Sequence, residues 1–291
     1  MKEVMIPEEI TYVAAFLTFR CSYRCSYCIN RHNTLKQRDE MSPKDWIEGL
    51  NRLALKKDLM LPITFQGGEP SAYTGFIEII QNLRKDFYID MLTNLFFDIE
   101  QFMKEIPPDR LQRDVPYASI RASYHPEFSD TDTLLEKIVS MQDHGYSIGL
   151  FAVDHPDINL DPIRNKSKSL GVDFRTKELL GMHNGELYGQ YAYANAVNGG
   201  ELKAVDCKTT ELLIAPDGCI HRCHRDLYQG ENSVGHILDE DLSITFPFRE
   251  CSRYGECNPC DIKIKNNRFQ QFGHCSVIIR DNHGIAYPKS R

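Results

Sequence analysis

The sequence has no apolar run long enough to cross a membrane. Its longest one, Tyr12 to Phe19, is far shorter than the roughly 18 residues that a membrane-spanning helix needs. A basic stretch followed by a hydrophobic core is also missing at the N-terminus, so the pattern of a secretory signal is absent. We therefore expect a cytoplasmic protein with no membrane partner.

The 291 residues also lack an excess of positive charge. Lys and Arg number 34 against 41 Asp and Glu, which gives a formal net charge of -7. Because binding to DNA or RNA depends on neutralising phosphates with Lys and Arg, this balance argues against a nucleic-acid partner. With 42% hydrophobic residues, the composition is that of a folded protein with room for one domain of about 200 residues and a smaller one.

Ten cysteines fall into two separate groups. Cys21, Cys25 and Cys28 lie near the start, about 180 residues follow without any, and seven more lie between Cys207 and Cys275. Disulfide frameworks belong mostly to small secreted domains, and this chain has neither the size nor the export signal of one. Metal ligation at two sites is the better interpretation.

Between the two groups, short β-branched runs alternate with helical segments. Strands are predicted at residues 11–19, 61–65, 87–92, 117–123, 147–153 and 172–179, and helices at 42–57, 75–84, 98–104, 131–144 and 160–170. Ser42 and Pro43 are typical of a helix start, an N-cap residue followed by proline. These βα units predict an α/β fold, a partial (βα)6 TIM-like barrel with its ligands at the carboxyl ends of the strands.

The character of the sequence changes at about Gly181, beyond which glycine, tyrosine and polar residues dominate as far as Gly200. This indicates a linker or an irregular covering segment. Further on, strand-like runs at 211–215 and 219–223 flank an Asp-Gly pair, which signals a hairpin. We expect two domains, the barrel at 1–182 and a small domain with this hairpin at 183–291.

The first cysteine group follows directly on the first predicted strand, where a barrel holds its active-site loops. Cys21-Ser-Tyr-Arg-Cys25-Ser-Tyr-Cys28 places three thiols within eight residues. Three thiolates on one short loop can hold three irons of a 4Fe-4S cluster and leave the fourth iron without a protein ligand. The alternative is a zinc site in which nearby His32 supplies a fourth ligand.

This C-x3-C-x2-C motif after the first strand of a βα barrel resembles that of the radical S-adenosylmethionine (SAM) enzymes, and the match extends over residues 11 to about 179. In that family the aromatic residue before the third cysteine, here Tyr27, lies beside the adenine of SAM. Gly67-Gly68-Glu69-Pro70 is similar to the family's GGEP motif. Adjacent glycines let the backbone approach a ligand, and the carboxylate can accept hydrogen bonds from the methionyl ammonium group.

The resemblance implies further contacts with SAM at the ends of later strands. Thr93 and Asn94 end the third predicted strand, and Ser119 and Arg121 lie in the fourth. The family places polar groups against the ribose and carboxylate of SAM at these positions, although it often has an aspartate where this chain has Arg121. A structural role, such as capping the next helix, is the alternative for Thr93 and Asn94.

The resemblance also implies the chemistry. A reduced cluster passes one electron to the sulfonium of SAM, and the products are methionine and a 5'-deoxyadenosyl radical that removes a hydrogen atom from a substrate. An electron donor such as flavodoxin or ferredoxin is implied. The protein positions the substrate carbon and keeps water and competing hydrogen donors away.

The second cysteine group resembles the auxiliary-cluster domains called SPASM and twitch. Cys207, ten residues, Gly218, four residues and Cys223 match the hairpin that begins those domains, and Cys257-Asn-Pro-Cys260 then completes four ligands for an auxiliary 4Fe-4S cluster. The later cysteine run of a full SPASM domain is absent. We therefore expect the shorter twitch form with one auxiliary cluster.

Three cysteines and several polar residues stay unassigned. Cys251 is the first candidate to replace a named ligand, and a second auxiliary cluster that also uses Cys219 and Cys275 is an alternative, as is a structural zinc ribbon. A polar group surrounds Cys223 and is either a substrate pocket, a set of cluster neighbours or surface: His221, His224, Arg225, Asp226 and Tyr228. His125 and His155, each followed by proline, end the fourth and fifth predicted strands on the side where a barrel pocket opens, and a structural turn is the preferred interpretation of each.

The predicted function is a radical SAM enzyme that acts on a small molecule such as a sugar, a nucleotide or another metabolite. Peptide-modifying relatives commonly carry an extra N-terminal domain, and only about ten residues precede the first predicted strand here. Alternatives are a peptide maturase, a glycyl-radical activase with a protein partner, and a non-catalytic zinc or iron-sulfur module. The reaction type is left open among oxidation, epimerisation and transfer, and no catalytic residue is assigned.

Overall fold

A nine-stranded sheet is the main element of the computed structural model, which describes residues 2–30, 35, 38–55, 60–197, 199–265 and 274–281. The strands follow the order β14-β13-β12-β2-β4-β5-β6-β7-β8, and those from β12 to β8 are parallel. The six predicted strands are β2 (Tyr12–Phe16), β4 (Pro62–Gln66), β5 (Tyr88–Thr93), β6 (Ile120–Tyr124), β7 (Ile148–Asp154) and β8 (Phe174–Glu178). The predicted parallel barrel strands are therefore confirmed.

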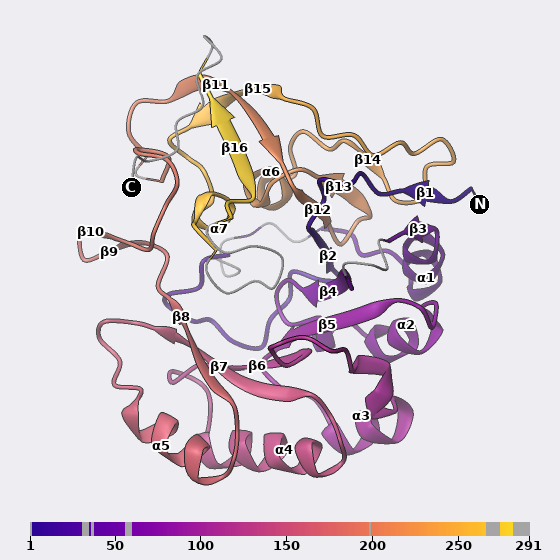
Figure 1. Ribbon diagram of the computed structural model, residues 1–291, viewed down its shortest axis with the longest axis vertical. Coiled ribbons are helices and arrows are strands. Elements are labelled where there is room, and N and C mark those ends of the chain that lie inside the picture. The colour runs from indigo at the N-terminus through magenta and orange to yellow at the C-terminus, as the bar shows by residue number, and fades with distance from the viewer. Residues whose placement is uncertain are drawn as a thin grey trace.

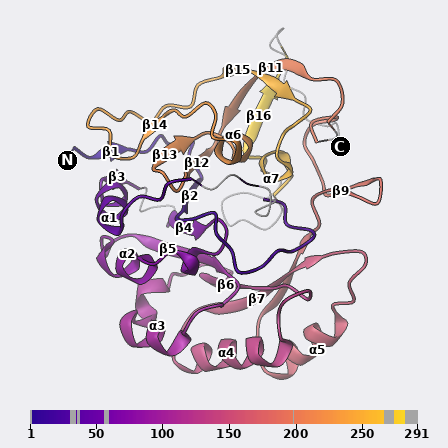
Figure 2. The ribbon, with the colours of Figure 1, turned by 180° about the vertical axis from the view of Figure 1, so that it is seen from behind.

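Helices cover the outer side of this sheet. They are α1 (Pro43–Asn51), α2 (Phe76–Asn82), α3 (Ile99–Glu105), α4 (Thr131–Asp143) and α5 (Asp161–Ser169), with short 3-10 helices at Pro70–Ala72 and Pro108–Leu111. Figures 1 and 2 show the strands as an arc with these helices on its convex side. The concave side, where a barrel holds its ligands, faces the C-terminal part of the chain.

Helix α1 begins as predicted but ends early. The Ser42 side chain accepts a hydrogen bond from the Asp45 backbone N–H at 3.2 Å, and Pro43 is the first helical residue. The predicted end at residue 57 is wrong, because the helix stops at Asn51 and the chain then forms β3 (Leu53–Ala54), which pairs with β1 (Val4–Met5). Pairing with a distant strand overrides the local helical pattern here.

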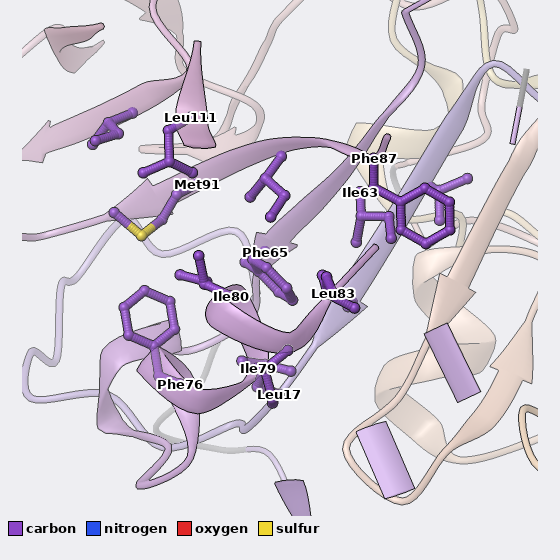
Figure 3. Packing of buried hydrophobic residues seen from close by; sticks show 14 of the residues in the cluster. Leu17, Ile63, Phe65, Phe76, Ile79, Ile80, Leu83, Phe87, Met91 and Leu111 are labelled. Carbon is purple, nitrogen blue, oxygen red and sulfur yellow. The ribbon is translucent and has the colours of Figure 1, made fainter. Parts of the chain in front are cut away.

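Apolar side chains lock the helices onto the strands. Between α2 and the sheet, Ile79 and Ile80 are fully buried, and the ring of Phe76 meets that of Phe65 edge to face at 6.4 Å (Figure 3). Burying each such isoleucine contributes about 1.5–3 kcal/mol. This packing fixes the strand ends from which the loops of the candidate site depart.

The predicted C-terminal hairpin belongs to the same sheet as the barrel. β12 (Glu211–Ile214) pairs in parallel with β2, and β13 (Cys219–His221) and β14 (Gly235–His236) follow it in antiparallel order. Gly218 makes the turn with a φ of 80°, as the Asp-Gly pair predicted. One sheet therefore crosses the predicted boundary at 182/183, and the division into domains at 1–182 and 183–291 stays a prediction.

The rest of the C-terminal part lies across the concave side of the arc (Figure 1). It contains a three-stranded sheet of β11 (Lys203–Thr209), β15 (Arg249–Tyr254) and β16 (Val277–Arg280), and the helices α6 (His224–Gln229) and α7 (Pro259–Ile262). In the part of the chain that the structure describes, no helix is both long and apolar enough to cross a membrane.

Part of the predicted linker is a regular hairpin. β9 (Gly181–His183) pairs with β10 (Glu186–Tyr188), and the turn residues Asn184 and Gly185 have φ angles of 50° and 84°. Positive φ at both turn positions is the geometry that an Asn-Gly pair adopts between two strands. This pair is the signal that would have predicted the hairpin.

Candidate active site

The first cysteine group forms one loop at the carboxyl end of β2. The Cys28 backbone N–H donates to the Cys25 carbonyl at 3.2 Å, and the Tyr23 N–H donates to the Cys21 Sγ at 3.4 Å. Cys25 is buried, while Cys21 and Cys28 are partly exposed. The loop therefore presents three thiols at the carboxyl ends of the parallel strands, where barrels of this kind have their ligand-binding sites.

These thiols repel one another as anions. Burial raises the pKa of Cys25 to about 12, and the charges of Cys28, Glu127 and Cys21 act in the same direction. Burial likewise raises the pKa of Cys21. Three thiolates at this loop therefore need a cationic partner to coexist, and a metal centre supplies one.

The spacing of the sulfurs bears on the zinc alternative. A single tetrahedral zinc with Zn–S bonds of 2.3 Å holds its sulfurs about 3.8 Å apart. Across the described residues, the side-chain groups whose ligand atoms all lie within 4.8 Å of one another include no cysteine. The three sulfurs of the loop are therefore not arranged around one tetrahedral zinc in the described structure. His32, the fourth ligand of the zinc alternative, lies outside the described residues.

The two glycines of the GGEP motif bring the chain against its own backbone. A Cβ on Gly68 would lie 2.0 Å from the Arg20 carbonyl oxygen, and one on Gly67, whose φ is 138°, would lie 2.6 Å from that of Thr18. Because no side chain intervenes, the Gly68 N–H donates to the Thr18 carbonyl at 3.1 Å, and the Glu69 N–H donates to the Arg20 carbonyl at 2.8 Å. In the described structure the glycines thus fasten the segment that leads into the cysteine loop.

Glu69 joins two of the other residues predicted to contact SAM, Thr93 and Asn94. Its carboxylate is 3% exposed and accepts from the Thr93 hydroxyl and from the Asn94 backbone N–H, both at 2.7 Å. Ser71 donates to the same carboxylate, and the Asn94 side chain donates to Ser22 Oγ at 3.1 Å. Burial raises the pKa of Glu69, and the hydrogen bonds oppose this. The network ties the end of β5 to the cysteine loop.

Tyr27 is held by two histidines that follow neighbouring strands. Its hydroxyl lies 3.1 Å from His125 Nδ1, and its ring centroid lies 5.5 Å from that of His155. Burial lowers the pKa of His125 to about 4, so the ring is neutral and its Nδ1 can accept a hydrogen bond from the Tyr27 hydroxyl. The sequence places both histidines on the pocket side of the barrel and favours turns for them, and in the structure their rings contact Tyr27.

The neutral state of His125 predicts a pH effect on stability. The folded-state pKa of about 4 is below the usual value of about 6.5, so the unfolded chain binds the proton more strongly as the pH falls from 6.5 to 4. Stability should therefore decrease over this window, although the Glu127 carboxylate opposes the shift. The variant His125→Asn keeps an acceptor and loses the titration. Its melting temperature should fall less between pH 7.5 and 5 than that of the wild type, and equal falls would contradict this.

The last two predicted residues lie lower in the barrel. Ser119 precedes β6, is fully buried, and lies at the amino end of the strand. Side chains alternate along a strand, so Ser119, Arg121 and Ser123 point to the same face of β6. Arg121 and Ser123 line the inner cavity. Sequence reasoning missed Ser123, although its place at the carboxyl end of a predicted strand was a usable signal.

Two cavities open beside the cysteine loop. The inner one, about 440 Å³, runs inside the strand arc from Cys25 and Cys28 to Cys260. The outer one, about 960 Å³, lies between the cysteine loop and the C-terminal part and is lined by Cys28 and Cys257. Both candidate metal sites therefore border the same space.

The β9–β10 hairpin and the loop after β7 supply a polar group at the outer cavity. His155, Asp157 and His183 line it, and His183 Nε2 lies 2.8 Å from Asp157 Oδ2. These residues come from separate segments of the sequence. The proximity of these three side chains was not predicted, because the segment that carries His183 was interpreted as a linker or covering segment.

Most of the C-terminal cysteines lie together. Cys207 on β11 is hydrogen-bonded to Cys251 on β15, and this bond raises the pKa of Cys207 and lowers that of Cys251. Burial raises the pKa of Cys257 to about 12, with Cys251 among the charges that add to the effect. Cys223 is partly buried and caps the start of α6. Burial raises the pKa of its thiol, and the Asp261 carboxylate adds to the effect.

Cys219 lies apart from this group. Its neighbours are Asp217, Ser233 and Arg38, and no other cysteine is among the charges that shift its pKa. All ten cysteines are free, as the metal interpretation requires.

The polar residues around Cys223 form a buried ion pair beside the inner cavity. His224 Nδ1 lies 2.7 Å from Asp261 Oδ1, and His224 and Tyr228 both line the cavity. Burial lowers the pKa of His224, but the Asp261 carboxylate outweighs it and raises the pKa to about 9. A cationic imidazolium therefore lies between Phe16 of β2 and Asp261 of α7.

Comparison with known proteins places this geometry in a family. The model described as the Radical SAM superfamily matches residues 16–168, just over half of the chain. Proteins named GTP 3',8-cyclase from Clostridium perfringens (strain SM101 / Type A) and Agrobacterium fabrum (strain C58 / ATCC 33970) are 24% and 22% identical over 194 and 185 residues. These matches cover 62% and 60% of this chain but only 58% and 53% of the relatives' own length.

Solved structures show the same fold. Streptococcus suis SuiB has a TM-score of 0.55 at 14% identity, over 80% of this chain and 64% of that one. A structure described as native anSMEcpe with bound AdoMet has a TM-score of 0.54 at 12% identity, over 83% and 79%. The cysteine loop and the α/β fold agree with the family match, and the chain belongs to the radical SAM superfamily.

Proposed function

We propose that this enzyme removes a hydrogen atom from a small-molecule substrate held in the inner cavity. The observation that carries the proposal is the loop of three cysteines at the carboxyl end of β2, which opens directly into that cavity. Cys21, Cys25 and Cys28 would hold a 4Fe-4S cluster with one iron free of protein ligands. When bound, the cluster supplies the electron that cleaves SAM reductively.

The residues around the loop would position SAM. Tyr27, fixed by His125 and His155, offers a flat ring for the adenine. Glu69, Thr93 and Asn94 form the polar network beside the loop, while Gly67 and Gly68 hold the loop in place. Ser119 and Arg121 lie below this layer, so the support for their predicted contacts with SAM is weaker.

The size of the inner cavity supports a small substrate. A volume of about 440 Å³ is within the range of about 300–1,000 Å³ found for small-molecule sites. The curated relatives are named for a reaction of GTP, which makes a nucleotide one member of the proposed class beside sugars and other metabolites. The strands around the cavity would limit the access of water to the reacting carbon.

A peptide substrate is the second candidate. The outer cavity of about 960 Å³ is large and borders the cysteine loop, and one structural neighbour with a TM-score of 0.51 is described with a bound peptide. Deuterium transfer distinguishes the candidates. A substrate labelled at the reacting carbon should deliver deuterium into 5'-deoxyadenosine, and the proposal fails if only peptides do so.

We propose that the C-terminal cysteines hold an auxiliary 4Fe-4S cluster. Cys207, Cys223, Cys257 and Cys260 remain the proposed ligands, and the contact between Cys207 and Cys251 keeps Cys251 as the alternative. A cluster with four cysteines would serve electron transfer or positioning. The external electron donor is proposed to be flavodoxin or ferredoxin, and the cytoplasm is the proposed location.

Replacing Cys257 by alanine tests the auxiliary cluster. The iron content should fall by about four atoms per chain, because one cluster is lost. SAM affinity should stay within about twofold, since Cys257 is not one of the residues of the proposed SAM layer. Iron analysis and equilibrium dialysis measure both quantities. Unchanged iron would show that Cys257 is not a ligand, and the same assay on Cys251→Ala would identify the replacement.

A further inference from the structure

The lower part of the inner cavity contains an unusual buried ion group. Asp90 on β5 is 1% exposed and receives three hydrogen bonds from Arg113, at 2.6, 2.6 and 3.0 Å. Arg121 on β6 reaches the same carboxylate at 3.1 Å, and its side chain is 19% exposed. One carboxylate therefore faces two guanidinium groups, and Arg113 already neutralises it.

Arg121 is incompletely satisfied and faces the cavity. Its Nε is buried without a hydrogen-bond partner, and its side chain lines the cavity beside Asp90 and Tyr117. Buried charges and donors of this kind are destabilising unless a partner compensates them. The partner that fits a guanidinium is an oxyanion such as a phosphate or carboxylate, which accepts two N–H groups at once.

Neighbouring side chains offer more donors to the same space. Thr64 Oγ1 and Gln66 Nε2, on the cavity face of β4, are also buried without a hydrogen-bond partner. Three of the cations that line the cavity already have carboxylate partners: Arg175 pairs with Asp173, Lys263 with Glu178 and Lys265 with Glu211. Arg121 instead shares Asp90 with Arg113 and keeps its Nε without a partner, so the open donors of the cavity lie around Arg121.

The strand register divides this anion site between two levels. Gln66 pairs with Phe16, where the cysteine loop departs, and the Arg121 backbone lies at that same level. Thr64 pairs with Asp90 two residues lower. Two residues along a strand correspond to about 7 Å. The guanidinium of Arg121 turns toward Asp90 and therefore lies below the layer of Tyr27, Glu69 and Asn94.

We propose that Arg121, with Thr64 and Gln66, binds the phosphate or carboxylate group of an anionic substrate. This names the substrate class of the proposed function and rests on it. It also gives Arg121 a role other than the predicted contact with SAM. The ion pair with Asp90 holds the guanidinium in position, so that the anion anchors the substrate below SAM with its reacting carbon directed upward.

Binding of inorganic pyrophosphate to the reconstituted full-length protein, saturated with SAM, tests the proposal. Calorimetry should show binding of one pyrophosphate per chain, weakened at least tenfold in Arg121→Gln and several-fold in Thr64→Val, which removes a hydroxyl without touching the ion pair. Lys168→Gln, an exposed lysine on α5, is the matched control and should bind as the wild type does. Melting curves check that each variant is folded.

Three outcomes would overturn the proposal. Expulsion of pyrophosphate by SAM, or an equal loss of SAM affinity in Arg121→Gln, would show that the guanidinium holds the carboxylate of SAM. Equal pyrophosphate affinity in the wild type and both variants would place the anion elsewhere. Absence of stoichiometric binding would show that the cavity does not select anions. Because SAM cleavage is measured separately, these failures are distinguishable from failure of the proposed function.

Discussion

Replacing Cys25 by alanine is expected to abolish SAM cleavage. Cys25 is the buried member of the three-cysteine loop, and its loss leaves two thiols, which cannot hold three corners of the cluster. Production of 5'-deoxyadenosine should fall below detection, and the iron content should fall by about four atoms per chain. Chromatography of the quenched reaction and iron analysis measure the two effects.

Cys219→Ala is the matched control for this experiment. Cys219 is a partly exposed cysteine beside Asp217 and Ser233, away from both proposed clusters. Its replacement should keep both the iron and the cleavage activity. Cleavage that persists in Cys25→Ala would mean that the first cluster is held elsewhere.

Replacing Gly68 by alanine is expected to be the most damaging single change outside the cysteines. The added Cβ would lie 2.0 Å from the Arg20 carbonyl oxygen, which is backbone and cannot rotate away. The hydrogen bonds that fasten the GGEP segment to the cysteine loop would break. We expect a loss of about 3 kcal/mol or more in the free energy of unfolding, together with loss of the first cluster.

Gly171→Ala separates this steric effect from backbone strain. Gly171 has a φ of 69°, and a Cβ there would meet no atom within 4 Å. Its replacement should cost only about 1 kcal/mol, from the left-handed backbone conformation. Denaturant unfolding of both variants makes the comparison. Similar losses in the two variants would show that the close approach at Gly68 does not support the loop.

The βα alternation could be predicted because each barrel strand carries its own local signal. Strand runs of five to seven residues alternate with helices whose caps, such as Ser42, are visible in the sequence. The sharing of one sheet between the barrel and the C-terminal part could not be predicted. It depends on the pairing of β12 with β2, nearly 200 residues earlier, and no local pattern encodes a partner at that distance.

The candidate site was predictable where short motifs encode it. The cysteine spacing and the GGEP residues follow single strands, so their convergence followed from the fold alone. The role of the two glycines could not be predicted from the motif. Glycine is required both where the chain approaches its own backbone and where it approaches a ligand, so the sequence does not distinguish the two cases. The paired charges of Asp90, Arg113 and Arg121 were missed for a related reason, since they come from separate segments and meet only in the folded chain.

Anaerobic reconstitution followed by reaction with SAM and a reductant tests the central claim most directly. The wild-type protein should bind about eight iron and eight sulfide atoms per chain, as two 4Fe-4S clusters, and should convert SAM into equal amounts of methionine and 5'-deoxyadenosine. Stoichiometric zinc in place of iron, with SAM left intact, would contradict the account.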